Sequence, residues 1–461
     1  MRCLFLSICI AISTVMMLHQ LAGGAAPPAS SVHWPQWRGP NADGSSPAKN
    51  LPTKWSLTEN IAWKTALPSW SGSTPVIWGD RVFVTSASAK PTTSASAGAQ
   101  FQPVGFGGGG SFGGRRDPGG PSVLLLCLNK KNGAIIWERK LEDGNRGWMK
   151  QNSASPSPVT DGKHVWVVTG NGQIVAFDFD GNARWQRNLQ TDYGKFGLLH
   201  GFASSPLLQD GKLIIQVLHG CTTDDPSYLV AFDAATGKPR WRVERPTDAI
   251  FESPDSYTTP QLAVFGGKPQ IVLSGGDYVT GHDTASGKEL WRAAGLNPNR
   301  DRAGRIIASP IVNDGIVYAP SKRRPLVALR VGGSGNVTNS HLVWKYEDTG
   351  GPDVPSPVCD GKYFYMIADN GAASCLDAKT GKVIYGPERT VVGTVSSSLV
   401  MADSKIYFIN ESGVTVVLAS GPAFKHLATN ELDGSFTLSS LAVSGNQLFA
   451  RTSTHLYCIG K

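Results

Sequence analysis

One motif recurs eight times along this chain and limits its fold more than any other feature. Its first half joins a Ser/Thr-Pro pair, an apolar pair, a turn such as Asp-Gly and a β-rich run, as in SPVTDGKHVWVV (157–168). The other copies begin at residues 73, 204, 258, 309, 356, 397 and 439, the last two with leucine in place of proline. Each copy predicts two antiparallel strands joined by a tight turn.

Most copies continue into a second half that predicts another hairpin. An apolar strand ends at an aspartate, a Thr/Ser-Gly-Lys turn follows, and an aromatic strand begins, as in LVAFDAATGKPRW (229–241). The aspartate can hydrogen-bond its own turn and the glycine supplies a positive φ, so the chain reverses there. The tryptophans in the last strands are predicted to pack between neighbouring sheets as core residues; they are Trp137, Trp185, Trp241, Trp291 and Trp344.

Two hairpins per copy make a four-stranded unit, and the copies follow one another at roughly 42 to 54 residues apart from one insertion. This period predicts an all-β fold, an eight-bladed β-propeller of four-stranded antiparallel blades, over residues 60–461. The last copy ends at HLYCIG (455–460) without a fourth strand, while NIAWKTALP (60–68) carries Trp63 where other fourth strands carry tryptophan. We therefore expect the N-terminal strand to close the last blade.

The first residues have the layout of a cleavable secretory signal. Arg2 precedes the apolar run 4–18, and small residues follow at 22–26. We assign residues 1–26 to a signal peptide and expect a periplasmic or secreted protein with no membrane span after cleavage. An uncleaved anchor is the alternative, but the run is shorter than the roughly 20 residues that cross a bilayer.

Residues 27–59 contain HWPQWRGP (33–40) and precede the closing strand. Trp34 and Trp37, stiffened by nearby prolines, are predicted to cover strand edge and interblade surface as a clasp. The alternative is a ligand site, because paired aromatic residues beside Arg38 also suit binding.

A long insertion interrupts the first copy at residues 87–122, between its second and third strands. It is rich in Gly, Ser and Pro, a composition typical of flexible loops. In an up-and-down blade this connection emerges on the same face as the connections into the innermost strands. The insertion is therefore predicted to lie on the face where the central channel opens.

Charge and cysteines exclude several classes of function. The net charge of +8 is scattered along the chain, which argues against nucleic acid as a partner. Five cysteines lie beyond the leader, and this odd number argues against a simple disulfide framework. There is no CxxC, HExxH or GxSxG motif, so we predict no metal site and no conventional nucleophile. We also expect a monomer.

The candidate site is the mouth of the central channel, where residues just before each innermost strand should converge. Those with binding chemistry are Trp70, Asn152, His200, Tyr257, Arg305 and Asp353. Together they could bind a small anionic or planar ligand. The alternative is that they only line a wet channel with hydrogen bonds.

The D-x-x-T-G-K-x-x-W repeats, the Ser-Pro-apolar-Asp-Gly strands and the WPQWRGP stretch resemble secreted bacterial proteins with PQQ-like (pyrroloquinoline quinone) β-propeller repeats. The resemblance covers nearly all of the chain beyond the leader and implies the propeller fold. Similar repeats occur in quinoprotein alcohol and glucose dehydrogenases and also in non-catalytic scaffolds such as the propeller lipoprotein of outer-membrane-protein assembly. The repeat itself does not separate these functions.

The dehydrogenases would imply PQQ and calcium, a tryptophan floor, an aspartate base and, in several, a disulfide between adjacent cysteines. This chain has no adjacent cysteine pair and no CxxCH heme site. We therefore expect a non-catalytic, extracytoplasmic scaffold that binds a cell-envelope protein or a small-molecule ligand. One alternative is a PQQ-dependent alcohol or sugar dehydrogenase, with Arg305 on the quinone carboxylates and Asp353 as base. The other is a carbohydrate-binding propeller with Trp70 and Tyr257 as stacking platforms.

Overall fold

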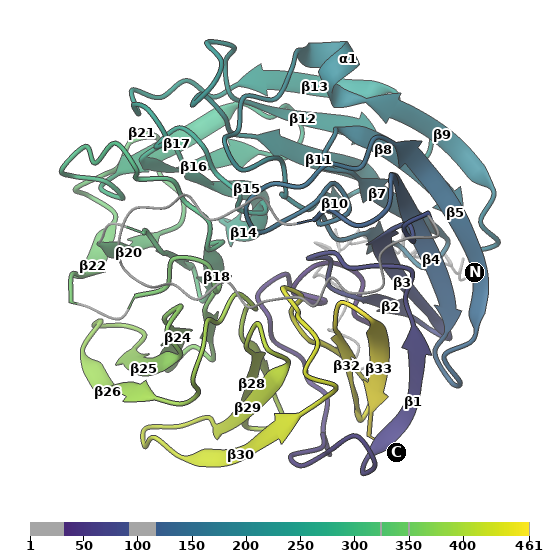
Figure 1. Ribbon diagram of the computed structural model, residues 1–461. Coiled ribbons are helices and arrows are strands. Elements are labelled where there is room, and N and C mark those ends of the chain that lie inside the picture. The colour runs from purple at the N-terminus through teal and green to yellow at the C-terminus, as the bar shows by residue number, and fades with distance from the viewer. Residues whose placement is uncertain (1–31, 92–116, 323–324, 349–350, 461) are drawn as a thin grey trace, which may run out of the picture.

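The computed structural model describes residues 32–91, 117–322, 325–348 and 351–460, and these form eight β-sheets arranged in a ring around a central channel (Figure 1). The predicted eight-bladed propeller is therefore confirmed. The predicted signal peptide and residues 92–116 of the predicted insertion lie outside the described residues. The described residues contain one short helix, α1 (Leu189–Tyr193), and no helix among them is long and apolar enough to cross a membrane.

The blades are numbered along the chain, and each is given from its innermost strand outward. Blade 1 contains β2 (Val76–Trp78), β3 (Arg81–Ala87), β4 (Ser122–Asn129) and β5 (Ile135–Asp143). Blade 2 contains β6 (Val159–Thr160), β7 (His164–Val168), β8 (Gln173–Asp178) and β9 (Ala183–Asn188). Blade 3 contains β10 (Leu207–Gln209), β11 (Lys212–Val217), β12 (Tyr228–Asp233) and β13 (Pro239–Glu244). Blade 4 contains β14 (Gln261–Phe265), β15 (Lys268–Gly275), β16 (Tyr278–Asp283), β17 (Glu289–Ala294) and β21 (Gly335–Asn336).

The second half of the ring has the same plan. Blade 5 contains β18 (Ile311–Asn313), β19 (Ile316–Ala319), β20 (Leu326–Arg330) and β22 (Leu342–Tyr346). Blade 6 contains β23 (Val358–Cys359), β24 (Tyr363–Ile367), β25 (Ala372–Asp377) and β26 (Val383–Arg389). Blade 7 contains β27 (Val400–Ala402), β28 (Lys405–Ile409), β29 (Val414–Ala419) and β30 (His426–Glu431). Blade 8 contains β31 (Ala442–Ser444), β32 (Gln447–Arg451), β33 (His455–Ile459) and β1 (Ile61–Ala66).

Blade 8 joins the two ends of the chain. Its outer strand β1 pairs antiparallel with β33, so that Trp63 lies opposite Cys458, and Figure 1 shows β1 beside the C-terminal strands. The predicted closure by an N-terminal strand is thus confirmed. The chain runs from β1 directly into blade 1, so the hydrogen bonds between β1 and β33 tie the first blade to the last and close the ring.

Tryptophans of the outer strands dock on the hairpin turn of the next blade. The indole of Trp185 in blade 2 donates a hydrogen bond to Ala234 O of blade 3 at 2.8 Å. Its ring lies against Gly237, whose φ is +70° and where an added Cβ would come within 2.6 Å of the indole. The Thr-Gly-Lys turn therefore needs glycine for two reasons, the backbone conformation and the close approach of the neighbouring ring.

Blade 4 departs from the predicted four strands and from this docking pattern. The connection between β20 and β22 of blade 5 is long, and its strand β21 pairs parallel with β17. Trp291 of β17 is fully buried, and its indole donates to Gln270 of its own blade at 2.8 Å. The docking turn is missing because blade 5 has no Asp-x-x-Thr-Gly-Lys sequence at this position.

A belt of hydroxyl groups joins the innermost strands. In blades 1 to 7, the Ser or Thr of the Ser/Thr-Pro pair, or of the Ser-Leu pair that replaces it, donates its backbone N–H to the hydroxyl oxygen of the equivalent residue in the next blade. Seven such bonds of 2.9–3.1 Å follow one another through Thr74, Ser157, Ser205, Thr259, Ser309, Ser356, Ser398 and Ser440. The junction between blades 8 and 1 is closed differently, by a bond from Ser439 Oγ to Ser73 O at 2.9 Å.

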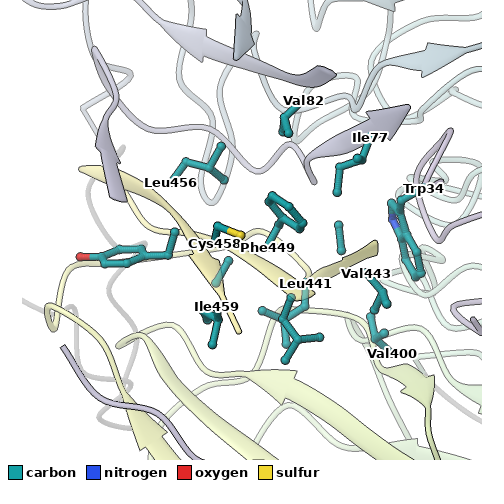
Figure 2. Packing of buried hydrophobic residues seen from close by; sticks show 14 of the residues in the cluster. Trp34, Ile77, Val82, Val400, Leu441, Val443, Phe449, Leu456, Cys458 and Ile459 are labelled. Atoms are coloured by element: carbon teal, nitrogen blue, oxygen red, sulfur yellow. The ribbon is translucent and has the colours of Figure 1, made fainter. Parts of the chain in front are cut away.

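Trp34 lies in the hydrophobic core that fills the junction of the first and last blades. It is fully buried in a cluster with Ile77 of blade 1, Val400 of blade 7 and Val443 of blade 8 (Figure 2). Its backbone also exchanges two 2.8 Å hydrogen bonds with Ile77. The N-terminal segment thus packs across the place where the ring closes.

The rest of the N-terminal segment runs along one face of the ring. On this face lie the hairpin turns that join the first and second strands of each blade. The buried guanidinium of Arg38 donates to the carbonyl oxygens of Ser356 and Pro357 in blade 6, and burial lowers its pKa to about 10. Further on, Ser46 N donates to Met401 O of blade 7 at 3.0 Å. Pro35 O accepts the N–H of Thr160 in blade 2, and Val32 O accepts a hydrogen bond from Ser444 Oγ in blade 8. Residues 32–60 therefore contact blades 1, 2, 6, 7 and 8, and Arg38 is a structural residue of this segment.

Candidate functional site at the channel mouth

The central channel contains a cavity of about 530 Å³. The hydroxyl belt lines its middle, and loop residues of several blades line one end. Trp37 also lines the cavity and belongs to the segment that crosses the opposite face. The channel is therefore a pocket with Trp37 at its floor and with its mouth on the face of the connections that lead into the innermost strands. A cavity of this volume lies in the range that holds a small-molecule ligand or the tip of a polypeptide loop.

Glu252 is the centre of the polar contacts at the mouth. Its Oε1 accepts a hydrogen bond from Arg305 Nη1 at 2.7 Å and lies 3.2 Å from His200 Nε2. Burial and the nearby Arg305 lower the pKa of His200, whereas Glu252 raises it. The backbone N–H of His200 donates to Tyr257 Oη at 3.1 Å, which fixes the two aromatic rings beside each other.

Two aspartates stand on the other side of Arg305. Asp353 Oδ2 lies 3.9 Å from Arg305 Nη2, while its Oδ1 is buried without a hydrogen-bond partner. Asp369 Oδ1 accepts the backbone N–H groups of Asp353 and Val354 at 3.1 and 3.0 Å. Burial raises the pKa of both carboxyl groups, and the charge of Asp369 adds to the rise at Asp353.

Lys150 extends over the mouth from the connection between β5 and β6. Its Nζ donates to Glu411 Oε1 at 2.8 Å and to Ser396 Oγ at 3.2 Å, both in the region of blade 7. This ion pair spans the mouth between blades that are not neighbours. It also brings positive charge near Asp369.

The structure brings together four of the six predicted site residues. His200, Tyr257, Arg305 and Asp353 all line the cavity. Trp70 and Asn152 are buried beside it and are held by hydrogen bonds: Trp70 Nε1 donates to Asp117 O, and Asn152 Nδ2 donates to Trp70 O, each at 2.9 Å. These two residues fix the base of the insertion, whose described ends carry an ion pair between Lys90 and Asp117.

Sequence reasoning missed Glu252, Lys150, Asp369 and the floor position of Trp37. Asp369 follows β24, and connections between second and third strands emerge on the mouth face, so the blade plan contained a signal for it. Glu252 and Lys150 lie inside long connections without a repeated motif, where no position can be assigned by counting strands. In the loop that connects β11 to β12, His219 is buried, and its Nδ1 accepts the N–H of Gly197 at 3.0 Å.

The donor set does not fit pyrroloquinoline quinone, which is a planar tricarboxylate. Such a ligand requires cationic side chains that can turn toward it. Arg305 is paired with Glu252 and Lys150 with Glu411, and Asp353 and Asp369 add two more acids to the same mouth. Among the described residues no group of three or more His, Cys, Asp or Glu side chains could hold a metal ion.

Comparison with known proteins identifies relatives of most of the repeat region. A family model described as "Outer membrane protein assembly factor BamB" matches residues 122–386 and 227–461. The outer membrane protein assembly factor BamB of Yersinia pestis is 24% identical over 273 residues, which cover 57% of this chain and 61% of that protein. The serine/threonine-protein kinase AfsK of Streptomyces griseus is 24% identical over 238 residues, which cover 46% of this chain and 28% of that protein. The chain thus spans less than two thirds of either relative.

Solved structures share the fold at low identity. A europium-containing methanol dehydrogenase superposes with a TM-score of 0.68 at 11% identity, covering 94% of this chain and 98% of that one. BamB from Moraxella catarrhalis superposes with a TM-score of 0.55 at 14% identity, covering 86% and 97%. At these identities the structures show the fold alone. Because the family model extends over most of the chain, this protein belongs to the PQQ-like β-propeller family described as outer membrane protein assembly factor BamB.

Proposed function

We propose that this chain is an exported, non-catalytic propeller that binds a protein of the cell envelope through the face that carries the channel mouth. Membership of the BamB-type family supports this proposal, because the family description names an assembly factor for outer membrane proteins. The leader-like sequence at residues 1–26 supports export to the periplasm or beyond.

The observation that carries the proposal is a group of exposed apolar side chains around the mouth, here called the mouth rim. Its members and exposed fractions are Met149 (44%), Leu199 (46%), Phe251 (52%) and Val392 (83%). Each lies on a connection from an outer strand to the next innermost strand, so all four are on the same face. Each is also close in sequence to a residue that lines the cavity or bonds to its lining.

Exposed apolar residues gathered on one face are typical of protein interaction sites. A non-obligate interface commonly has an apolar centre and uses aromatic and arginine side chains as anchors. The rim supplies an aromatic and an arginine anchor together, because the Arg302 guanidinium stacks on the ring of Phe251. Partner contact with four loops from different blades would also explain why these loops carry no repeated motif.

The two alternatives have less support. A quinone site would need cations that can turn toward the ligand, and Arg305 and Lys150 are paired with Glu252 and Glu411. A sugar platform would need an open aromatic face, and Trp70 is 4% exposed and does not line the cavity.

Site-specific photocrosslinking in the native host tests the proposal. A photoreactive phenylalanine analogue would replace Leu199 or Val392 on the rim, with Val264 and Phe265 as matched controls. These two apolar residues are exposed to a similar degree, 65% and 50%, but lie at the β14–β15 hairpin on the opposite face. We expect protein adducts of discrete mass from the rim positions only. Equal adducts from both faces, or none from the rim, would contradict the proposal.

Calorimetric titration with pyrroloquinoline quinone, with and without calcium, tests the non-catalytic part. We expect no binding heat. Binding in the micromolar range or tighter that Arg305→Ala abolishes would overturn this part and favour a quinoprotein dehydrogenase.

A further inference from the structure

Among the residues that the structure describes, carboxylates outnumber cationic side chains at the mouth. Four carboxylates converge there, those of Glu252, Asp353, Asp369 and Glu411. Arg305 and Lys150 each donate their short hydrogen bonds to one carboxylate, Glu252 and Glu411. Lys322 is a third cation near the mouth, and its charge acts on Asp353 together with those of Arg305 and Lys150. The ion pair that Arg305 makes with Asp353 is longer, 3.9 Å, and the other oxygen of Asp353 accepts no hydrogen bond. Asp353 thus offers a buried carboxylate oxygen that accepts no hydrogen bond from the described residues.

We propose that the mouth receives the tip of a partner's loop in which a lysine or arginine enters the cavity beside Asp353 while flanking apolar residues cover the mouth rim. This inference rests on the proposed function and deepens it by naming the chemistry of the partner segment. The occupant follows from complementarity: the exposed apolar residues of the mouth rim lie on the same face as a pocket whose described carboxylates outnumber its cations.

The shape of the pocket favours a long basic side chain. The channel continues below Asp353 past small residues and hydroxyl groups, including Ala203 and Ser205, to the indole of Trp37. The stem of lysine or arginine can lie along such a wall while its charged end hydrogen-bonds to a carboxylate. A lone metal ion is a poorer match, because no described cluster of three suitable ligands is present.

Selection of random peptides against the full chain tests this inference. Phage displaying disulfide-closed random nonapeptides would be selected on the immobilised protein, and enriched peptides would be synthesised for fluorescence polarisation. We expect enriched peptides to carry Lys or Arg between apolar residues. Replacing that basic residue by glutamine should weaken binding at least about tenfold, the loss expected for a hydrogen bond to a charged group.

Two variants locate the binding site, and one controls for surface apolarity. Asp353→Asn keeps the shape of the side chain and removes the charge, so binding should fall at least about tenfold. The rim variant Leu199→Ser/Val392→Ser should also weaken it, whereas Val264→Ser/Phe265→Ser on the opposite face should not. Thermal melting of each variant verifies folding, and the exposed rim residues can be replaced without opening the core.

The inference is overturned if enriched peptides lack a basic residue, if their affinity is unchanged by Asp353→Asn, or if repeated selections enrich no peptide. It is separable from the proposed function. Rim crosslinks in cells together with any of these results would retain partner binding and reject the basic loop. Absence of rim crosslinks would reject partner binding at this face itself.

Discussion

Lys150 Nζ lies 2.8 Å from Glu411 Oε1, and this ion pair connects the loop before blade 2 to blade 7 across the channel mouth. Its partners are partly buried, with side-chain exposures of 31% and 14%, so the pair is less screened by solvent than a surface pair. It is the kind of contact that can hold two distant blades at a set separation.

A double-mutant cycle with Lys150→Met and Glu411→Gln should give a coupling energy of about 1 kcal/mol in urea unfolding followed by tryptophan fluorescence. The surface pair Lys140 and Asp143, at 2.8 Å but more than half exposed, is the control and should show no measurable coupling. Additive effects of the two mouth substitutions would mean that the pair does not stabilise the ring.

Trp34 and Trp37 should differ sharply in their effect on stability. Trp34 is fully buried between blades, and Trp34→Ala should lower the free energy of unfolding by about 3–5 kcal/mol. Trp37 is only half-buried and borders the cavity, so Trp37→Ala should cost less and enlarge the channel. Thermal melting of the two single variants compares these losses of stability. Equal losses would show that both residues act as a clasp and that the floor assignment of Trp37 is wrong.

The hydroxyl belt predicts a contrast between two threonines. Thr259 Oγ1 accepts the N–H of Ser205 at 3.1 Å, so Thr259→Val leaves a buried donor without a partner and should cost about 1–3 kcal/mol. Thr74 Oγ1 is buried and accepts no hydrogen bond, so Thr74→Val should be nearly neutral. Urea unfolding of the two valine variants measures the difference between their free energies of unfolding. If Thr74→Val were the more damaging, the belt would also close between blades 8 and 1 through this hydroxyl.

The repeats allowed the blade number, the strand order and the closing strand to be predicted because each follows from local patterns. Alternation and Asp-Gly turns specify hairpins within a few residues, and the missing fourth strand in blade 8 pointed to β1. The Ser/Thr before each proline was equally visible, yet its role was not, because its hydrogen-bond partner lies one blade away in the sequence.

The mouth was less predictable for a physical reason. Residues just before the innermost strands could be placed by counting strands, which brought His200, Tyr257, Arg305 and Asp353 into one cavity. Which charges pair there depends on loop conformations that no repeat specifies, and the acceptor Glu252 lies inside such a loop. Trp291 shows the same limit, because its burial depends on an atypical turn in the following blade.

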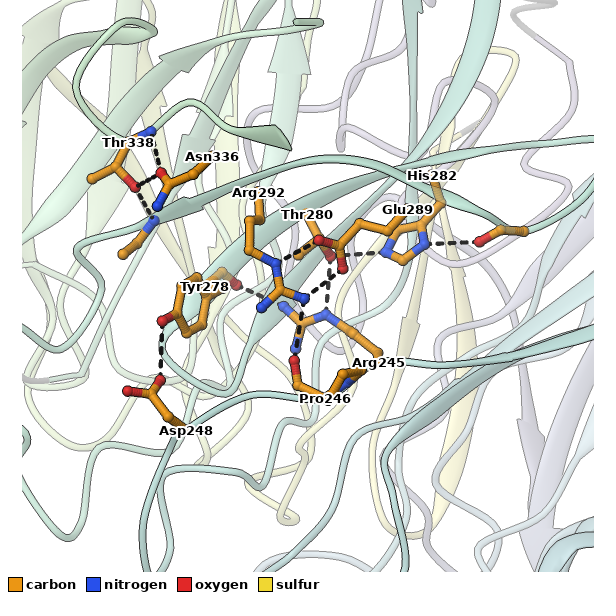
Figure 3. A network of polar contacts seen from close by, with 12 residues as sticks. Arg245, Pro246, Asp248, Tyr278, Thr280, His282, Glu289, Arg292, Asn336 and Thr338 are labelled. Atoms are coloured by element: carbon orange, nitrogen blue, oxygen red, sulfur yellow. Dashed lines mark hydrogen bonds and ion pairs between the residues drawn. The ribbon is translucent and has the colours of Figure 1, made fainter. Parts of the chain in front are cut away.

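Buried His282 in blade 4 should make stability depend on pH. Its Nδ1 donates to Gly287 O, and its Nε2 accepts from Thr280 Oγ1, each at 2.9 Å, while Arg245 Nε donates to the same threonine (Figure 3). This arrangement holds the imidazole in its neutral form, since both ring nitrogens are used and the cation Arg245 stands close by. Burial lowers the pKa of His282 to about 4.

Because this pKa lies below the ordinary value of 6.5, the unfolded chain takes up a proton on His282 before the folded chain does. Its contribution is therefore complete above about pH 6.5 and is lost as the pH falls toward 4, by up to about 3 kcal/mol. The buried Asp255, with a pKa raised to about 6, acts in the opposite sense in the same range, so only a difference between variants isolates the histidine. His282→Gln should be less stable than the parent at pH 8 and should approach it as the pH is lowered to 4. The exposed His426→Gln variant is the control and should follow the parent throughout. Parallel pH profiles for His282→Gln and the parent, measured by urea unfolding, would show that folding does not lower the pKa of His282.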